Sequence, residues 1–472
     1  MLGKAIQPEI EELIAAGQFD ELRDILANNL EAADIAEILD EVNDEDRALL
    51  FRLLPTQLAS DVFSLLEIEG QEKLIQSLSR EQVTHILNEM SPDDRTRLLE
   101  EVPDEVAQRL LRALNPKELA VARTLLGYPE ESIGRRMTPE YVAANPNWTV
   151  RQTLDFIRRE APRVETINVL YVLDDQGRLV DDLRLGELLL ADPDATIRDI
   201  CDFQFVSLSA FEDQEEAVEA FKKYDRLALP VVGSKGVMVG IVTVDDVLDL
   251  AEEEGTEDVQ KFGGQEALED SYFATTVLQL ARKRGLWLTV LLVSSFLTVT
   301  AMNHFSYLTV LMPVLTVFIP MIISSGGNSG SQSAALIIRG LAVREIELAN
   351  WWRVFLRELA AGLLLGLFLG VIAGGFSVAL RDRAAVQSGE PAEAAVGGAA
   401  EENRLGLPLL VLLSVTGVVT IGTLVGSMLP FFFKRIGLDP AVCSGPFIAT
   451  FVDVSGIVLF FTLFRLIFGG YL

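Results

Sequence analysis

An apolar run near the C-terminus constrains this chain more than any other feature. Residues 440–464 contain a single charged side chain, Asp453. A helix over this run is long enough to cross a bilayer. A carboxylate near the middle of such a helix costs about 3 kcal/mol on insertion scales, so it usually faces a protein interior, a partner or a watery path. Two roles are open for Asp453: a buried residue hydrogen-bonded to neighbouring helices, or a cation-coordinating residue of a pore.

Four further apolar segments precede this run, so residues 285–472 are predicted to form a transmembrane domain of five helices. The predicted spans are Leu286–Asn303, Phe305–Ile338, Leu359–Leu380, Leu405–Phe433 and Pro440–Phe464. Lys and Arg gather before the first span and in the second-to-third and fourth-to-fifth loops. This bias predicts a multi-pass protein of the cell inner (plasma) membrane, with the N-terminus cytoplasmic and the C-terminus outside. The Ala-, Gly- and Glu-rich loop Arg381–Arg404 is expected to be disordered and external.

The second span is too long for one crossing and is interrupted by helix-weakening residues. They are Pro313, Pro320 and the stretch Ser324–Ser333. Broken backbone at membrane depth is tolerated where it lines a cavity or is buried in protein, and small residues also allow close helix packing. The pair Gly326–Gly327 beside Asn328 and Gln332 favours a pore lining, because carbonyls and amides offer oxygen ligands to a hard cation.

Residues 1–277 are acidic, with a net charge of −33, while the remainder is close to neutral at +3. Such a field draws cations and repels nucleic acid, so no nucleic-acid partner is expected. Two cysteines and two distant histidines provide neither a disulfide framework nor a zinc site. The N-terminus lacks a signal-peptide core, which predicts a cytoplasmic location for this part. The sequence contains no nucleophile–base pair and no phosphate loop, so an enzyme is not expected.

Residues 1–130 are predicted to form a helical solenoid. From residue 43 a repeat appears at a spacing of 12, and such short helices must stack to bury their apolar faces. The units start at Asn43, Pro55, Glu67, Ser79, Ser91, Pro103 and Asn115. Asn, Ser and Pro are typical of helix starts. Acidic first turns such as Asp93–Asp94 complement the helix dipole.

Residues 131–250 alternate between strand and helix patterns and contain two similar copies, with hairpins at Asn168–Arg178 and Leu229–Val242. A run of eight carboxylates without Lys or Arg follows: Asp245, Asp246, Asp249, Glu252, Glu253, Glu254, Glu257 and Asp258. A solvated acidic helix is one interpretation. Because like charges at helical spacing repel, divalent cations or a basic partner are the other, and Asp213, Glu215 and Asp225 could complete such sites.

In this order of segments the chain resembles the MgtE-type magnesium channel/transporter family over nearly its whole length. The motifs that carry the resemblance are Gly326–Ala334, Leu438–Ala441, Asp453–Gly456 and the CBS-type signature Gly240–Asp246. The resemblance implies a multidomain membrane protein: an all-α N domain (1–130), an α/β tandem CBS pair (131–250), an acidic plug helix and connector (245–284), and the five-helix pore domain. Ser331 and Gly445 stand where the family often has Asn.

The resemblance further implies a homodimer in the lipid membrane, with a pore for hydrated Mg²⁺, and Mn²⁺ or Co²⁺ as further candidate ions. The implied pore residues are Asp453, Ala449, Asn328, Gly327 and Gln332. Cytosolic Mg²⁺ is expected to close the pore by bridging carboxylates of the N domain, the CBS pair and the plug helix. The implied bridging residues are Asp93, Asp94, Asp213, Glu215, Asp225, Asp246, Asp249, Glu253, Glu254, Glu257 and Asp258.

The same resemblance implies an adenine-nucleotide site, with ATP as the candidate ligand, at Tyr171, Thr243 and Asp246. The first CBS copy departs from the signature at Arg184 and Glu187. Two other functions remain open. An ion-coupled secondary transporter for divalent cations also suits broken helices with one intramembrane carboxylate. A membrane-tethered nucleotide sensor would bind nucleotide strongly and would not need Asp453.

Overall fold

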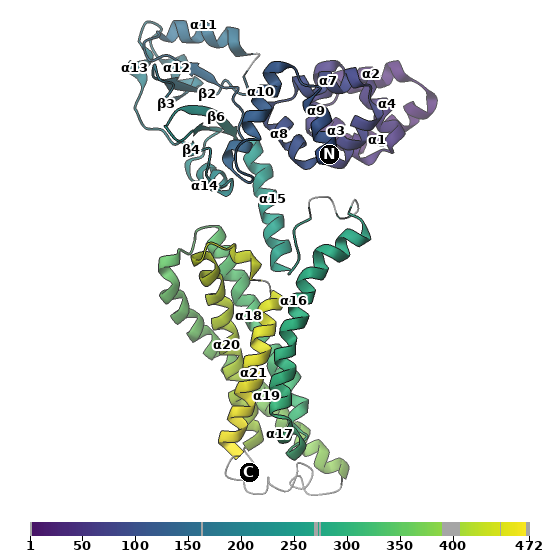
Figure 1. Cartoon of the computed structure of the whole chain (residues 1–472), viewed down its shortest axis with the longest axis vertical. Helices are drawn as coiled ribbons and strands as arrows, with labels where there is room; N and C mark the ends of the chain where they lie inside the picture. Colours follow the sequence, from purple (N-terminus) through teal and green to yellow (C-terminus); the bar gives the residue numbers. More distant parts are fainter. Residues whose placement is uncertain are drawn as a thin grey trace. The chain divides into compact units, whose positions relative to one another are not determined.

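The computed structural model describes residues 2–161, 164–268, 272, 275–388, 406–443 and 445–468. The chain divides into two compact units, Met1–Glu254 and Gly255–Leu472 (Figure 1). The predicted loop Arg381–Arg404 is helical up to Ser388, and its residues 389–404 lie outside the described part.

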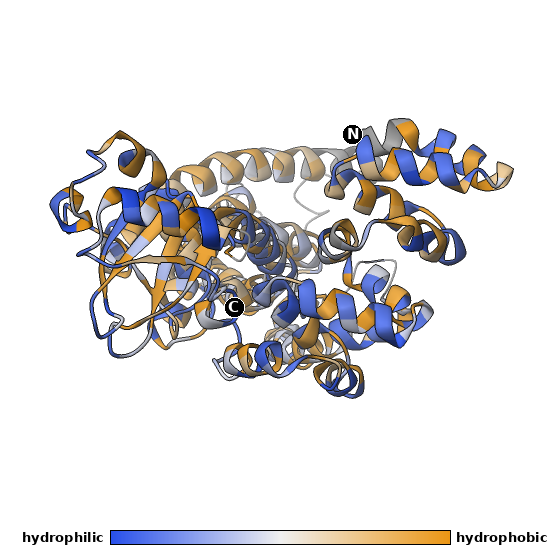
Figure 2. Cartoon of the chain, turned by 90° about the horizontal axis from the view of Figure 1, so that it is seen from above, coloured by the Kyte–Doolittle hydropathy of each residue, from blue (hydrophilic) through white to orange (hydrophobic). Residues whose placement is uncertain are grey.

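The first unit begins with a solenoid of short helices. Its elements are α1 (Leu2–Ala16), α2 (Phe19–Asn28), α3 (Ala32–Glu41), α4 (Asp44–Leu53), α5 (Thr56–Ser64), α6 (Ile68–Ser77), α7 (Arg80–Glu89), α8 (Pro92–Glu101), α9 (Asp104–Leu111) and α10 (Pro116–Leu125). The predicted start residues are the N-caps of α4 to α10, which confirms the repeat. Both colours appear along these helices in Figure 2, as expected of helices that bury one apolar face.

Two three-stranded sheets follow, one for each predicted copy. In the first sheet β1 (Val142–Ala144) pairs parallel to β2 (Val169–Leu173), which pairs antiparallel to β3 (Leu179–Arg184). The second sheet repeats this order with β4 (Leu208–Ser209), β5 (Ala228–Val232) and β6 (Met238–Thr243). Helices α11 (Val150–Glu160), α12 (Leu185–Leu190), α13 (Ile197–Ile200) and α14 (Glu215–Tyr224) complete the pair.

The acidic run is helical throughout. It forms α15 (Val244–Phe262), which starts directly after β6 and ends in the second unit. The chain thus passes from one unit to the other within a single helix.

The second unit contains the long apolar helices. They are α16 (Val277–His304), α18 (Leu315–Ala342), α19 (Trp351–Ser388), α20 (Gly406–Arg435) and α21 (Gly445–Phe468), with the short α17 (Ser306–Leu311) before α18. By length and composition α16, α19, α20 and α21 can each cross a membrane. Helix α18 has 28 residues, as many as α16, but the polar stretch Ser324–Ser333 lies at its centre.

Of the predicted interruptions of the second span, the one at Pro313 is confirmed, but Pro320 and Ser324–Ser333 do not break the helix. The break lies at residues 312–314, between α17 and α18, while the Gly- and Ser-rich stretch is continuous helix. Its glycines instead permit close packing against α20: a Cβ added at Gly422 or Gly426 would overlap the carbonyl oxygen of Gly326 or Gly330, respectively. The alternative interpretation, small residues for helix packing, therefore describes Gly326 and Gly330.

Glycines also line the contact between α19 and α20. Gly362, Gly366, Gly370 and Gly374 recur at every fourth position, and a Cβ on Gly366 would lie 2.7 Å from the Thr416 carbonyl oxygen. Since lipid tails provide no hydrophobic drive for association, close packing of this kind holds the helices together.

We predict that Gly426→Ala destabilises the protein by about 1–3 kcal/mol, because the new methyl group overlaps backbone that cannot move away freely. The measurement is thermal unfolding of the purified protein in detergent. Gly375→Ala is the matched control, since a Cβ there meets no atom within 4 Å. Equal losses for both variants would contradict the packing role of Gly426.

Candidate metal-binding sites

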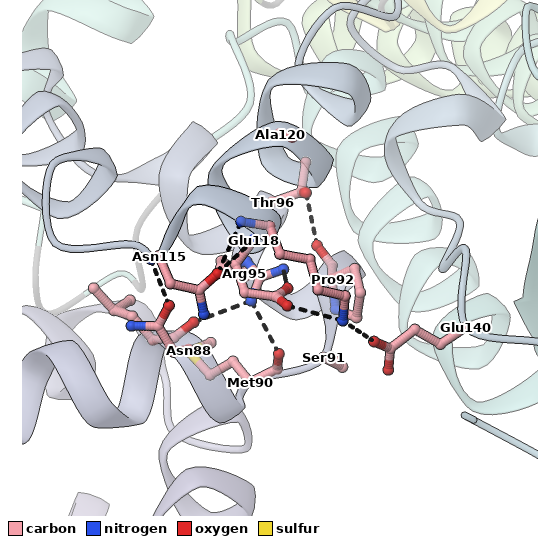
Figure 3. A network of polar contacts seen from close by, with 12 residues as sticks. Asn88, Met90, Ser91, Pro92, Arg95, Thr96, Asn115, Glu118, Ala120 and Glu140 are labelled. Atoms are coloured by element: carbon pink, nitrogen blue, oxygen red, sulfur yellow. Dashed lines mark hydrogen bonds and ion pairs between the residues drawn. The ribbon is translucent and has the colours of Figure 1, made fainter. Parts of the chain in front are cut away.

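The first candidate site depends on α8, which a buried arginine fixes in the solenoid. Arg95 is fully buried, and its guanidinium donates to the carbonyls of Leu87 and Met90 and to Glu118 Oε2 at 2.6 Å (Figure 3). Glu118 belongs to α10. This network sets the position of the first turn of α8, where Asp93 and Asp94 lie.

A small polar pocket lies where α8 meets α15. It is lined by Asp93, Asp94, Arg97, Arg136, Asp246, Asp249, Leu250 and Glu253. The predicted solenoid carboxylates and the first part of the acidic run are thus brought together, although more than 150 residues separate them in the sequence. The pocket has about 40 Å³ of room for water-sized atoms, enough for a few water molecules.

Burial and mutual repulsion perturb the carboxylates of this pocket. Burial, with the charge of Asp94 next, raises the pKa of Asp93 to about 7. Burial and the charge of Asp93 raise the pKa of Asp246 to about 8. Glu165, from the loop before β2, has its pKa raised to about 7 by burial and by Asp246. The ionised forms of these groups therefore need a counter-charge.

The donor set fits a hydrated divalent cation. Among the described residues the buried Asp93 Oδ1 has no hydrogen-bond partner, while Asp246 Oδ2 accepts from Thr243 Oγ1 at 2.5 Å. Within the described ranges no three metal-ligating side chains converge closely enough to form a complete coordination shell. Mg²⁺ commonly keeps several waters and binds one or two carboxylates directly, so this arrangement suits it.

The other predicted regulatory residues do not line this pocket. Asp213 and Glu215 lie at the start of α14, where Asp213 Oδ1 accepts from the Glu215 backbone N–H, and Asp225 ends that helix in a left-handed conformation. Glu254 accepts from Gln214 Nε2 at 2.6 Å. Gln214 in turn accepts from Arg136, so Glu254 neighbours the pocket through a polar chain.

Arg97, Arg136 and Glu165 were missed by sequence reasoning. Arg97 lies one helical turn after Asp93, so its presence on the same face could have been deduced from the spacing. Arg136 and Glu165 come from irregular segments of the CBS pair, and no pattern in the sequence places them near α8.

The last predicted carboxylates, Glu257 and Asp258, belong to the second unit with the end of α15. Lys261 contacts Glu257 at 2.5 Å and Asp439 at 2.8 Å. Burial, followed by the charge of Asp439, raises the pKa of Asp258. Phe262, the residue after Lys261, packs against the core of the membrane helices. Its Cζ atom lies 3.7 Å from the position that a Cβ on Gly445 would take.

Asp453 lies on α21 and is half-buried. Among the described residues no hydrogen bond or ion pair is formed by its carboxylate. Ala449 lies one turn earlier, and its Cβ is 3.4 Å from the position of a Cβ on Gly327, so α18 and α21 are in contact there. Asn328 and Gln332, one turn apart on α18, are exposed. The structure thus gathers the predicted pore residues on two adjoining helices.

The predicted nucleotide residues occupy different environments. Tyr171 is fully buried in the core shared by the two sheets, and its hydroxyl has no partner in the described part of the chain. The Thr243 hydroxyl is occupied by Asp246. Asp246 itself lines the acidic pocket.

Comparison with known proteins covers both units. Residues 319–463 match the MgtE family described as "Divalent cation transporter", residues 30–131 match "MgtE intracellular N domain", and residues 197–253 match "CBS domain". The chain is 36% identical to the magnesium transporter MgtE of Thermus thermophilus over 461 residues, 97% of each chain. It is 30% identical to MgtE of Bacillus subtilis, covering 93% of this chain and 94% of that one.

Two solved structures resemble the first unit. One is the cytosolic domain of the Mg²⁺ channel MgtE in complex with ATP, with 37% identity and a TM-score of 0.50 over 52% of this chain and 99% of that one. The other is the soluble part of a magnesium transporter, with 28% identity and a TM-score of 0.50 over 53% and 99%. The chain is therefore a multi-pass membrane protein of the MgtE family of magnesium transporters.

Proposed function

We propose that this protein is a homodimeric Mg²⁺ channel whose conducting path passes Asp453. The observation that carries the proposal is the half-buried Asp453 carboxylate on a membrane helix, which has no partner among the described residues. An intramembrane carboxylate without a protein partner marks an ion path or a subunit contact. In a two-fold dimer one residue can serve both, because the same patch of each subunit meets at the axis.

The neighbouring polar groups support a hydrated ion. Asn328 and Gln332 are exposed on α18, next to the contact between Gly327 and Ala449. The side-chain amide oxygens of these residues and the Ala449 carbonyl oxygen can accept hydrogen bonds from the waters bound to Mg²⁺. The ion gives up these waters reluctantly. Mn²⁺ and Co²⁺ are candidate competitors for such a path.

We further propose that cytosolic Mg²⁺ regulates the channel through the pocket between α8 and α15. An ion there would balance Asp93 and Asp246 and so favour the arrangement in which these helices meet, which is a population shift by differential affinity. We call the pocket between α8 and α15 the sensor. Because α15 continues from this pocket to Phe262 in the membrane unit, it connects the sensor covalently to the membrane helices. ATP binding to the CBS pair, and a cytoplasmic N-terminus with an external C-terminus, belong to this proposal.

We predict that Asp453→Ala lowers Mg²⁺ flux into proteoliposomes by about tenfold or more, since loss of a charged ligand costs at least about 1.4 kcal/mol of ion stabilisation. Thr462→Ala is the control, because within the described ranges its hydroxyl donates to the Val458 carbonyl of its own helix and to no other group. Undiminished flux in Asp453→Ala would return Asp453 to a packing role. Wild-type flux that requires a Na⁺ or H⁺ gradient would favour the ion-coupled transporter.

We predict that the sensor loses stability with rising pH when divalent cations are removed. The pKa values of Asp93 and Asp246 rise on folding from 3.8 to about 7 and 8. Folding therefore binds protons, and the associated stability is present below about pH 4 and lost as pH rises through 7 to 8. Thermal unfolding of the full chain in a chelator at pH 5 and 8.5 measures this.

The double variant Asp93→Asn with Asp246→Asn should flatten this pH dependence, whereas Glu105→Gln on the exposed face of α9 should not. Mg²⁺ should restore more stability at pH 8.5 than at pH 5, because protons compete with the ion for the same oxygens. Identical pH profiles for the wild type and the double variant would contradict the assignment.

A further inference from the structure

The acidic pocket already contains positive charge of its own. Arg97 Nη2 lies 2.7 Å from Glu253 Oε1, and Arg136 Nη2 lies 3.4 Å from Glu253 Oε2. Both oxygens of Glu253 thus face guanidinium groups. Arg97 also contacts Glu101 at 3.1 Å and lies 3.9 Å from Asp249.

These arginines come from two different elements and converge on α15. Arg97 belongs to α8 of the solenoid, whereas Arg136 follows a short 3-10 turn at the start of the CBS pair. Arg136 is also held in place by Gln214 Oε1, which accepts from its Nε at 3.0 Å. One carboxylate of α15 is therefore the meeting point of the solenoid and the CBS pair.

The pocket consequently has two ends of different character. At one end Asp93 is buried and Asp246 is half-buried, and neither carboxylate contacts a cationic side chain among the described residues. At the other end Glu253 is neutralised by Arg97 and Arg136. A cation added to the second end would have to displace guanidinium groups that are already bound, whereas the first end lacks any such competitor.

We propose that Arg97 and Arg136 are resident counter-ions that supply a Mg²⁺-independent part of the attraction between α8, the CBS pair and α15, and that they confine the regulatory ion to the Asp93–Asp246 end. This inference deepens the proposed regulation by cytosolic Mg²⁺ and rests on it. The arginines set how much of the docking is independent of the ion. Their removal therefore makes docking depend more strongly on Mg²⁺.

The test measures the distance between α9 and α15 in the full-length protein by pulsed electron paramagnetic resonance. Spin labels are placed at Glu105→Cys and Glu252→Cys, both exposed positions, after Cys201 and Cys443 are replaced by Ser. Without divalent cations the wild-type background should give a narrow docked population beside a broad separated one, and Mg²⁺ should enlarge the docked population. Arg97→Ala with Arg136→Ala should shrink the docked population without divalent cations, and millimolar Mg²⁺ should restore it.

Two matched variants separate docking from folding. Arg151→Ala with Arg158→Ala removes two exposed ion pairs of the first CBS copy and should leave the docked population as large as in the wild type. Arg97→Lys with Arg136→Lys retains the charge and should keep the docked population larger than the alanine pair does. Raising KCl to about 1 M, where the Debye length falls to about 3 Å, should shrink the docked population of the wild type, since the side chains of Arg97 and Glu253 are 38% and 39% exposed.

Flux measurements provide an independent readout. Arg97→Ala with Arg136→Ala should raise the internal Mg²⁺ concentration for half-inhibition by about 3- to 10-fold, the range expected for two partly exposed ion pairs. A docked population without Mg²⁺ that is as large for the alanine pair as for the wild type, or as small for the lysine pair as for the alanine pair, would overturn the inference. Wild-type flux that ignores internal Mg²⁺ would instead refute the proposed regulation, and the distance distributions would still decide the role of the arginines.

Discussion

Repulsion among carboxylates that fold into one pocket is the constraint on which the cytoplasmic part of this structure depends. Asp93 and Asp246 come from distant parts of the sequence, yet burial raises the pKa of both carboxyls, the charge of Asp94 raises the pKa of Asp93 further, and the charge of Asp93 raises the pKa of Asp246 further. A buried negative charge is tolerated only when it is protonated, paired or bound to a cation. At Glu253 the chain supplies the pair itself through Arg97 and Arg136, and at Asp93 it leaves room for an ion.

The membrane unit satisfies a different constraint by a different means. Because its helices cannot rely on the hydrophobic effect for association in lipid, α20 packs by glycine seams against α18 and α19. Those seams fix α18 beside α21, where Gly327 meets Ala449. The same packing leaves the Asp453 carboxylate and the amides of Asn328 and Gln332 without hydrogen-bond partners in the part of the chain that the structure describes, so these groups are candidates for contact with an ion.

Much of this architecture was predictable because local patterns determine it. The caps at Asn43, Ser79, Ser91 and Asn115 mark helix starts by their own side-chain chemistry, and the repeat follows from them. The Ser324–Ser333 stretch was misjudged since glycine in a sequence indicates either a break or a close contact, and only the carbonyls of α20 decide between them. Arg136 and Glu165 could not be placed at all, because no periodicity links irregular segments to α8.

The most direct test of the account is to locate the ion in the pocket. Crystals of the full-length protein grown with Mn²⁺ as a substitute for Mg²⁺ would be examined by anomalous scattering. The account predicts a peak between Asp93 and Asp246, with Glu253 still bound to Arg97 and Arg136. A peak at Glu253 with the arginines displaced, or no peak near Asp93 at millimolar Mn²⁺, would contradict it.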